Sequence, residues 1–260
     1  MELGLKGKVA LVTGSSRGIG RGIALAFADA GCDLLLTGRD QAALDDVAAA
    51  IRGKQHKAAV RALDLRAADA AETLVQAAQS EFGGLDILIN NAGTTKRGDF
   101  FALTDADWHD GYALKFFAHV RLARAAWPLL KERHGALVAI GGTSGRKPEK
   151  RFTIGSSVNA AVAAFTKCLA DLGKEDGVRV NCIHPSLVET ERQWHRIRAE
   201  VERTGEPEGK VRERFCRETG FTRYGTVEDV ADFVTFMVSS RATWLHGATV
   251  DLDGGEIPVL

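Results

Sequence analysis

Short apolar runs alternate along the whole chain with longer segments of helical period, and this alternation is the strongest constraint on the fold. Near-continuous apolar strands separated by helices are typical of a parallel sheet covered on both faces. The expected strands occupy residues 9–13, 33–38, 58–65, 85–93, 135–142, 178–185 and 248–255. The expected helices occupy residues 18–30, 41–52, 67–82, 105–132, 156–174 and 227–239. With no linker or repeat in its 260 residues, the chain predicts one three-layer, doubly wound α/β domain with right-handed crossovers.

One segment, residues 191–223, departs from this pattern because it is highly charged and weakly apolar. We expect it to form one or two exposed helices inserted before the last strand–helix unit. Two interpretations stay open at this point. The segment is either a solvated helical excursion or a mobile flap over a site at the sheet edge.

Composition excludes several classes of protein. Lysine plus arginine equals aspartate plus glutamate, 34 each, so net charge favours neither nucleic acid nor an anionic membrane as partner. The first residues do not read as a signal peptide, and no apolar run approaches the roughly 18 residues of a spanning helix. The four cysteines are scattered, with no metal-binding spacing. These features predict a reduced, cytoplasmic protein without a metal site.

A glycine-rich turn between the first strand and the first helix predicts a nucleotide site. Glycines at such a turn let a phosphate approach the backbone, and the helix N-terminus supplies N–H donors and a positive dipole end. The context of strand, turn and helix within about 30 residues makes this more specific than a lone glycine triplet. The turn comprises Thr13, Gly14, Ser15, Ser16, Arg17, Gly18, Ile19 and Gly20.

With this turn, several other motifs in the same order resemble the short-chain dehydrogenase/reductase family over essentially the whole chain. Residues 90–93 match its NNAG motif, residues 179–185 resemble its RVN…PG segment, and residues 226–255 are close to its C-terminal signature. The resemblance implies a seven-stranded Rossmann fold. Beyond the glycine turn, it implies that cofactor is also bound by Asp64, Leu65, Asn91, Ala92, Gly93, Pro185, Val188 and Thr190. Ser186 stands where the family usually has glycine.

The choice between the two nicotinamide cofactors is a question of charge. An acidic residue at the end of the second strand would accept the ribose 2′-hydroxyl of NAD and repel a 2′-phosphate. Gly38 takes that place, Arg39 follows it, and Arg17 lies in the glycine turn. Two guanidinium groups without an acid predict NADP(H) rather than NAD(H). The alternative is that Arg39 only solvates the end of a strand.

The catalytic positions depart from the resemblance. The family has a serine, a tyrosine and a lysine four residues later, with an asparagine on the preceding helix. Aligned on flanking motifs, these positions hold Gly142, Gly155, Asn159 and Lys115 respectively. Phe152, which corresponds to the tyrosine of the related enoyl reductases, also lacks the hydroxyl. The family's ordinary proton relay is therefore not expected here.

The lysine and asparagine positions appear exchanged in the alignment, which suggests that Lys115 restores an ammonium from the opposite helix while Asn159 bonds the ribose. Burial lowers a lysine pKa, so Lys115 is our candidate general acid or base. The alternative is a lysine that reaches a carboxylate or a subunit interface. Other candidate donors, ranked below it, are Thr143, Ser144, Ser156, Tyr112 and His184.

Basic residues gather in loops expected at the carboxyl edge of the sheet, and they bear on the substrate. They are Lys96, Arg97, the loop 146–151, His195, Arg196 and Arg198. In a chain of zero net charge, this local excess of positive charge predicts that the substrate is an anionic small molecule. The alternative is that the loops are charged only because they are solvated.

Three functions remain open. The first is an atypical NADP(H)-dependent oxidoreductase acting on a small, acidic carbonyl or enoyl compound. The others are a nucleotide-binding pseudoenzyme and a non-redox lyase, dehydratase or hydrolase in the same cleft. The resemblance also implies a homotetramer or homodimer.

Overall fold

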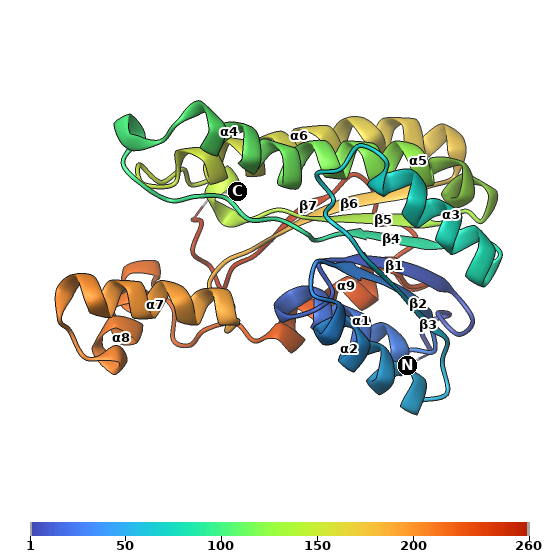
Figure 1. The fold of residues 1–260 in the computed structure, drawn as a ribbon, viewed down its shortest axis with the longest axis horizontal. Helices are drawn as coiled ribbons and strands as arrows, with labels where there is room; N and C mark the ends of the chain where they lie inside the picture. The colour runs from blue at the N-terminus through green and yellow to red at the C-terminus, as the bar shows by residue number, and fades with distance from the viewer. Residues whose placement is uncertain (1, 259–260) are drawn as a thin grey trace.

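The computed structural model describes residues 2–258, and its centre is a seven-stranded parallel sheet with strand order β3-β2-β1-β4-β5-β6-β7. The chain forms β1 to β3 outward in one direction, returns to the middle with β4, and then builds outward in the other (Figure 1). This reversal places a crevice at the carboxyl ends of β1 and β4. The strands are β1 Val9–Thr13, β2 Asp33–Gly38, β3 Ala58–Ala62, β4 Ile87–Asn90, β5 Ala136–Ile140, β6 Arg179–Pro185 and β7 Thr249–Leu252.

Helices cover both faces of the sheet, as the alternating pattern predicted (Figure 1). One layer contains α1, α2 and α9, and the other contains α3, α5 and α6. The helices are α1 Gly18–Asp29, α2 Gln41–Gly53, α3 Ala70–Phe82, α4 Asp105–Tyr112, α5 Ala118–Glu132, α6 Thr153–Asp176, α7 Glu191–Thr204, α8 Glu208–Thr219 and α9 Val227–Val238.

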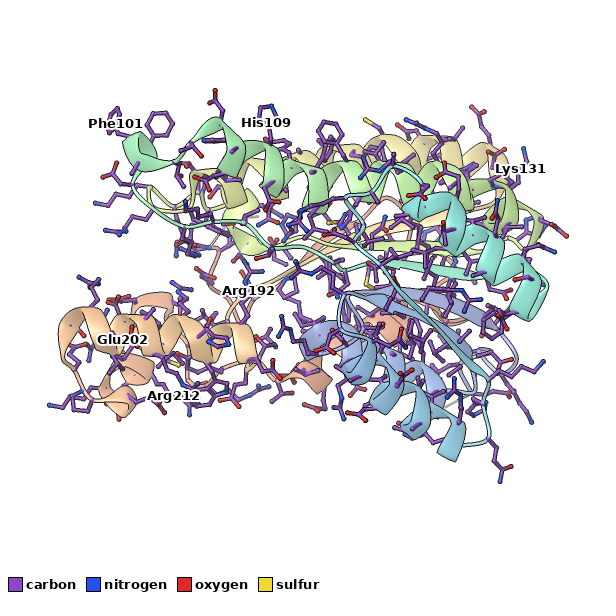
Figure 2. All side chains as sticks on the ribbon, in the orientation of Figure 1. Phe101, His109, Lys131, Arg192, Glu202 and Arg212 are labelled. Carbon is purple, nitrogen blue, oxygen red and sulfur yellow. The ribbon has the colours of Figure 1, made fainter. Side chains whose placement is uncertain are left out.

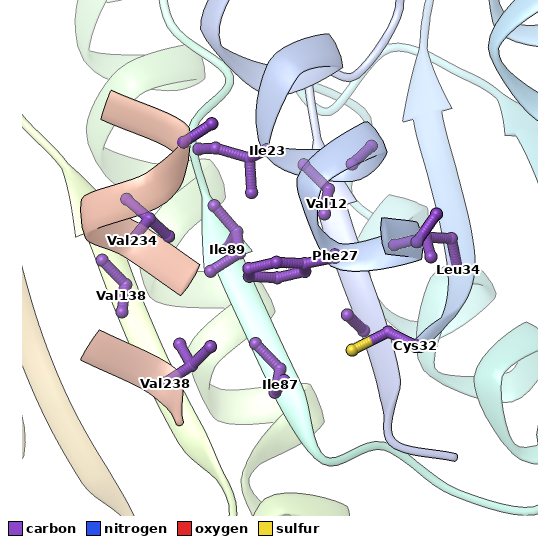
Figure 3. Packing of buried hydrophobic residues seen from close by; sticks show 14 of the residues in the cluster. Val12, Ile23, Phe27, Cys32, Leu34, Ile87, Ile89, Val138, Val234 and Val238 are labelled. Carbon is purple, nitrogen blue, oxygen red and sulfur yellow. The ribbon is translucent and has the colours of Figure 1, made fainter. Parts of the chain in front are cut away.

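Two apolar cores hold the three layers together. Within a strand, successive side chains enter opposite cores, so Leu11 packs under α3 and α5 while Val12 packs under α1 and α9. Figure 3 shows the second of these cores, in which the ring of Phe27 from α1 lies between the strands and α9. Because both faces of the sheet are covered, its strands consist of near-continuous apolar residues.

A π-helical segment, Ala113–Phe117, interrupts the long helix expected at residues 105–132. α4 begins at a capping box on Thr104, where Asp107 and Thr104 bond each other's backbone amides. The wider π turn then shifts the register of the side chains before α5 begins. Such π segments often occur at functional sites, and this one carries Lys115.

The ends of several elements differ from the sequence prediction. β3 stops at Ala62 and β4 at Asn90, so residues 63–65 and 91–93 are loop rather than strand. α6 begins at Thr153 instead of residue 156, which places Gly155 inside the helix. Among residues 2–258, no helix combines the length and apolarity needed to cross a bilayer.

The charged segment forms the helices α7 and α8, which pack on each other and project from the main body (Figure 1). A small separate core joins them, built from Ile197, Val211, Phe215 and Tyr224 with Leu187. Arg214 on α8 adds ion pairs to Glu200 on α7 at 2.9 Å and to Glu206 in the turn at 2.9 Å. The helical prediction for this segment is therefore correct, and its role as a mobile flap stays a prediction.

Candidate active site

A cavity of about 880 Å³ lies at the carboxyl ends of the strands, between the sheet edge and the helices α7 and α8. It brings together residues that are widely separated in the sequence. Among the predicted cofactor residues, those that line it are Gly14, Ser16, Arg17, Gly18, Ile19, Gly20, Arg39, Asp64, Leu65, Asn91, Ala92, Gly93, Pro185, Val188 and Thr190.

Ser15 is the one predicted cofactor residue that does not line the cavity. The residue is fully buried, and its hydroxyl accepts a hydrogen bond from the Thr37 amide at 3.1 Å. The Ser15 side chain therefore joins β1 to β2 behind the cavity. Ser15 lies only two residues after the end of β1. The sequence alone therefore does not show whether its side chain faces the cavity or the neighbouring strand.

The glycine turn has the shape that a phosphate site requires. Gly14 and Gly18 have positive φ angles, +65° and +55°. A Cβ atom on Gly20 would lie 2.3 Å from the Gly14 carbonyl oxygen and 2.5 Å from Nδ2 of Asn91, so only glycine fits there. α1 then begins at Gly18, and the side chain of its N-cap residue, Arg17, makes no capping bond. Its first amides are thus open to an anion.

The far end of the cavity is basic. Arg39 is exposed, and no carboxylate of residues 2–258 lies within 4 Å of its guanidinium. Arg17 pairs only with Glu191, at 3.4 Å, and both side chains are exposed. Burial by itself would raise the pKa of Asp64, but hydrogen bonds from Arg66 and the charges of Arg66 and Arg39 hold that pKa below its usual value. These groups fit an adenosine with a 2′-phosphate beside Arg39.

Lys115 lies at the opposite end, buried in the wall of the cavity with 8% of its surface exposed. Its aliphatic chain crosses Gly93, where a Cβ atom would come within 2.8 Å of Lys115 Cδ. Its Nζ donates to the Gly141 carbonyl oxygen at 3.1 Å, and no carboxylate in the described part of the chain pairs with it. Burial, followed by the charge of Arg192, lowers the Lys115 pKa from 10.5 to about 7. The alternative of a lysine held by a carboxylate is therefore wrong.

Asn159 and Gly142 meet beside this lysine. Asn159 Nδ2 donates to Ser144 Oγ at 2.9 Å. A Cβ atom on Gly142 would lie 2.8 Å from the same Nδ2, so the amide occupies the space of a Gly142 side chain. Asn159 Oδ1 is buried and has no hydrogen-bond partner among the described residues. This oxygen is therefore enclosed behind the cavity wall, while Nδ2 holds the Ser144 hydroxyl in place.

Gly155 does not line the cavity, because an aromatic ring takes its place. A Cβ atom on Gly155 would lie 2.1 Å from Cζ of Phe152. Phe152 itself lines the cavity, and the Arg97 guanidinium stacks on its ring at 3.8 Å. Arg97 is in turn held by Glu149, through bonds of 2.7 and 3.0 Å. The site thus presents an aromatic ring and an ion pair on this side.

The other candidate donors divide into two groups. Thr143 and Ser144 line the cavity. Tyr112 packs between the rings of Trp108 and Phe116, and the Ser156 hydroxyl accepts from the Glu149 amide at 3.2 Å, so neither lines it. His184 is fully buried behind Gly141, and burial lowers its pKa to about 4. Tyr112, Ser156 and His184 therefore do not line the cavity.

Several cavity residues were not singled out from the sequence, chiefly Arg192, Glu149 and Glu256. Arg192 lies on α7 at the end nearest the sheet (Figure 2). Glu256 accepts a hydrogen bond from Ser186, the residue that replaces the usual glycine. Arg192 belongs to the charged segment, which has no motif, so only the folding of α7 over the sheet edge identifies it. Glu149 and Glu256 come from the loop before α6 and from the residues after β7.

The fold and cavity define a class, the α/β proteins that bind a dinucleotide at the switch point of a parallel sheet. The sequence profile of the family described as Enoyl-(Acyl carrier protein) reductase matches residues 14–256. The chain belongs to the short-chain dehydrogenase/reductase family of oxidoreductases.

Individual relatives agree with this assignment. An uncharacterised oxidoreductase of Mycobacterium tuberculosis is 34% identical, over 96% of this chain and 92% of that protein. The 3-oxoacyl-[acyl-carrier-protein] reductase of Escherichia coli is 30% identical, over 97% of this chain and 98% of its own length. The crystal structure of L-sorbose reductase from Gluconobacter frateurii with NADPH and L-sorbose superposes with a TM-score of 0.96, at 32% identity and full coverage of both chains.

Proposed function

We propose that this protein is an NADP(H)-dependent oxidoreductase that acts on a small, acidic carbonyl or enoyl compound without the serine, tyrosine and lysine of its family. The observation that carries the proposal is the single cavity, which joins an uncapped helix N-terminus to a buried lysine with a pKa of about 7. The solved structure of a related reductase with NADPH supports the choice of cofactor.

The residues at the cofactor end have separable tasks. The glycine turn and the open amides of α1 would hold the pyrophosphate, Arg17 and Arg39 the 2′-phosphate, and Asp64 the adenine. Val188 and Thr190 line the cavity where the nicotinamide would lie, beside Gly93. When bound, the nicotinamide supplies or accepts a hydride.

Lys115 is the proposed proton donor. A carbonyl reduction needs a proton at the substrate oxygen, and a positioned general acid is typically worth about 10²–10⁴ in rate. A pKa near the working pH lets a lysine give and regain a proton, which an ordinary surface lysine does poorly. Asn159, which also lines the cavity, would support it by bonding a ribose hydroxyl through its side-chain amide.

Cofactor binding and turnover test the proposal separately. Calorimetric titration with NADPH and NADH should show micromolar binding of NADPH and weaker binding of NADH. A panel of small oxo acids should then oxidise NADPH with the wild-type protein, and Lys115→Ala should lose turnover while it still binds NADPH. Lys174→Ala, on the exposed end of α6, is the matched control and should keep full activity. Unchanged turnover in Lys115→Ala would remove its catalytic role.

A second function is favoured by Gly155 and Phe152. Neither tyrosine of the chain, at 112 and 224, lines the cavity, and a phenyl ring fills the space at Gly155. A pseudoenzyme or a non-redox lyase, dehydratase or hydrolase would be compatible with that wall. NADPH binding without oxidation by any carbonyl or enoyl compound would favour this second function.

We also propose a homotetramer or homodimer. Trp244 and Phe101 are 99% and 94% exposed, and Phe117 at the start of α5 is 49% exposed. Large aromatic side chains at such exposure are typical of interfaces. Light scattering on the purified protein would give the mass of the assembly, and a monomer at micromolar concentration would contradict the proposal.

A further inference from the structure

Two arginines on α7 face the cavity without an acidic partner. Arg192 and Arg196 lie one helical turn apart, both line the cavity, and we call them the α7 arginine pair. Across residues 2–258, no carboxylate oxygen lies within 4 Å of either guanidinium. Arg192 donates only one long bond, of 3.5 Å, to the Gly93 carbonyl oxygen, and Arg196 stacks over Phe215 at 4.8 Å.

Two basic residues near the pair already have acidic partners. Arg97 forms its two bonds with Glu149, and Lys147 pairs with Glu256 at 3.4 Å. The basic loops noted in the sequence therefore do not attract an anion as a group. Among residues 2–258, the α7 arginine pair lines the cavity with no carboxylate within 4 Å, although Glu149 and Glu256 lie near enough to offset part of the charge of Arg196.

The surroundings of the pair favour a bound anion. Arg192 is exposed to solvent in the open cavity, whereas Arg196 is half-buried in its wall. Loss of hydration and the charge of Arg97 lower the pKa of each guanidinium below its usual value, and at Arg196 the charges of Glu149 and Glu256 oppose this shift in part. An arginine cannot respond by losing its proton. A bound oxoanion would supply a negative charge and accept hydrogen bonds from both guanidinium groups.

The position of the pair separates it from the cofactor phosphates. Glu191, the preceding residue, faces α1 and pairs with Arg17. Arg192 points to the other side, toward the carbonyl of Gly93, and Gly93 is the residue that the Lys115 side chain crosses. The pair therefore faces the end of the cavity that holds Lys115.

We infer that the α7 arginine pair binds the carboxylate or phosphate group of the substrate and so places an anionic carbonyl compound beside Lys115. This inference rests on the proposed function, because it assigns the substrate class of the same site. Binding would also join α7 to the main body across the cavity, since the anion would be held by α7 while its carbonyl lies against the wall formed by the π segment.

The same anion would change the charge of Lys115. The titratable groups that face Lys115 are Arg192 from α7, Cys182 and His184 from β6, and His119 from α5. Burial keeps the pKa of Cys182 at about 12 and those of His119 and His184 at about 4, so these three are neutral at pH 7. Arg192 is then the charged neighbour. An anion on Arg192 would raise the Lys115 pKa and protonate the donor when substrate arrives.

Calorimetry on the NADPH-saturated protein tests this without a known substrate. Malonate and inorganic phosphate are the probes, each titrated at pH 7 and low salt. The probe that binds more tightly indicates whether the substrate carries a carboxylate or a phosphate group. Arg192→Gln and Arg196→Gln should each weaken that anion roughly tenfold or more. Arg198→Gln is the matched control, because this arginine is exposed on the same helix and does not line the cavity.

Proton uptake provides a second measurement. Repeating the titration in buffers of different ionisation enthalpy should show uptake of a fraction of a proton per anion, and Lys115→Met should abolish it. Equal anion affinity in all three arginine variants, or no anion binding to a protein that binds NADPH, would overturn the inference while the proposed function stands. Loss of NADPH rather than anion affinity in Arg192→Gln would also overturn it. Failure to bind NADPH would instead reject the proposed function.

Discussion

The ring of Phe152 occupies the space into which a side chain on Gly155 would project, with only 2.1 Å between Phe152 Cζ and an added Cβ. The helix α6 can therefore begin as it does only with glycine at this position. The same ring supports Arg97 at 3.8 Å and so forms one wall of the cavity. The two residues are consequently coupled, so the effect of substituting one on the free energy of unfolding should depend on the residue present at the other position.

The first prediction concerns this pair. Gly155→Ala should reduce the free energy of unfolding by about 1–3 kcal/mol, because the methyl group overlaps the ring. In a Phe152→Ala background the same substitution should cost much less, since the ring is gone. Denaturant unfolding of the wild type, the two single variants and the double variant gives the coupling free energy between the two positions. Gly209→Ala, where no atom lies within 4 Å of the added Cβ, is the control. Additive effects would show that the ring does not fill this space.

The second prediction concerns stability and the protonation of Lys115. Its pKa is about 7 in the folded protein against 10.5 as the ordinary value. Above pH 7 the unfolded chain therefore holds a proton that the folded protein has released, so the wild type should gain stability with rising pH. Relative to Lys115→Met, the gain should approach about 1.4 kcal/mol per pH unit, and it should vanish below pH 7. Urea unfolding between pH 6 and 9.5 measures this. If the difference in free energy of unfolding between the wild type and Lys115→Met stays constant over that range, Lys115 remains charged in the folded protein.

A third prediction concerns cofactor choice. Arg39→Gln should weaken NADPH binding roughly 10- to 100-fold and leave NADH binding nearly unchanged, because only NADPH carries the 2′-phosphate. Fluorescence titration with both cofactors measures this. Arg217→Gln, an exposed arginine on α8, has the same change in charge and should alter neither affinity. Equal weakening of both cofactors by Arg39→Gln would contradict recognition of the phosphate.

The fourth prediction concerns the hairpin of α7 and α8. Arg214 bonds Glu200 and Glu206 and so ties the two helices together, whereas Arg203 pairs with Glu200 within α7 alone. Arg214→Gln should speed proteolytic cleavage within residues 191–219 while the thermal midpoint of the main body stays the same. Arg203→Gln should cleave at the wild-type rate. Identical cleavage of all three proteins would show that the hairpin does not open locally.

Much of the fold could be predicted from local sequence. Apolar strands and amphipathic helices each bury a face that their own residues define, so the sheet, its two helical layers and the glycine turn follow from the pattern. The ends of β3 and β4 and the start of α6 could not be predicted, because each depends on what packs beside it. Phe152 beside Gly155 is the clearest case.

The amino-acid sequence by itself identified the family and the glycine turn, and it supplied the proposal for the residues at 115, 142, 155 and 159. Only the tertiary structure decided their chemistry. Burial and the charge of Arg192, which arrives from a helix 77 positions further along the chain, lower the pKa of Lys115, and Ser15 and His184 turn away from the cavity. The physical reason is that electrostatic environment depends on distance and solvent exposure in space. Neither quantity is encoded in the spacing of residues along the chain.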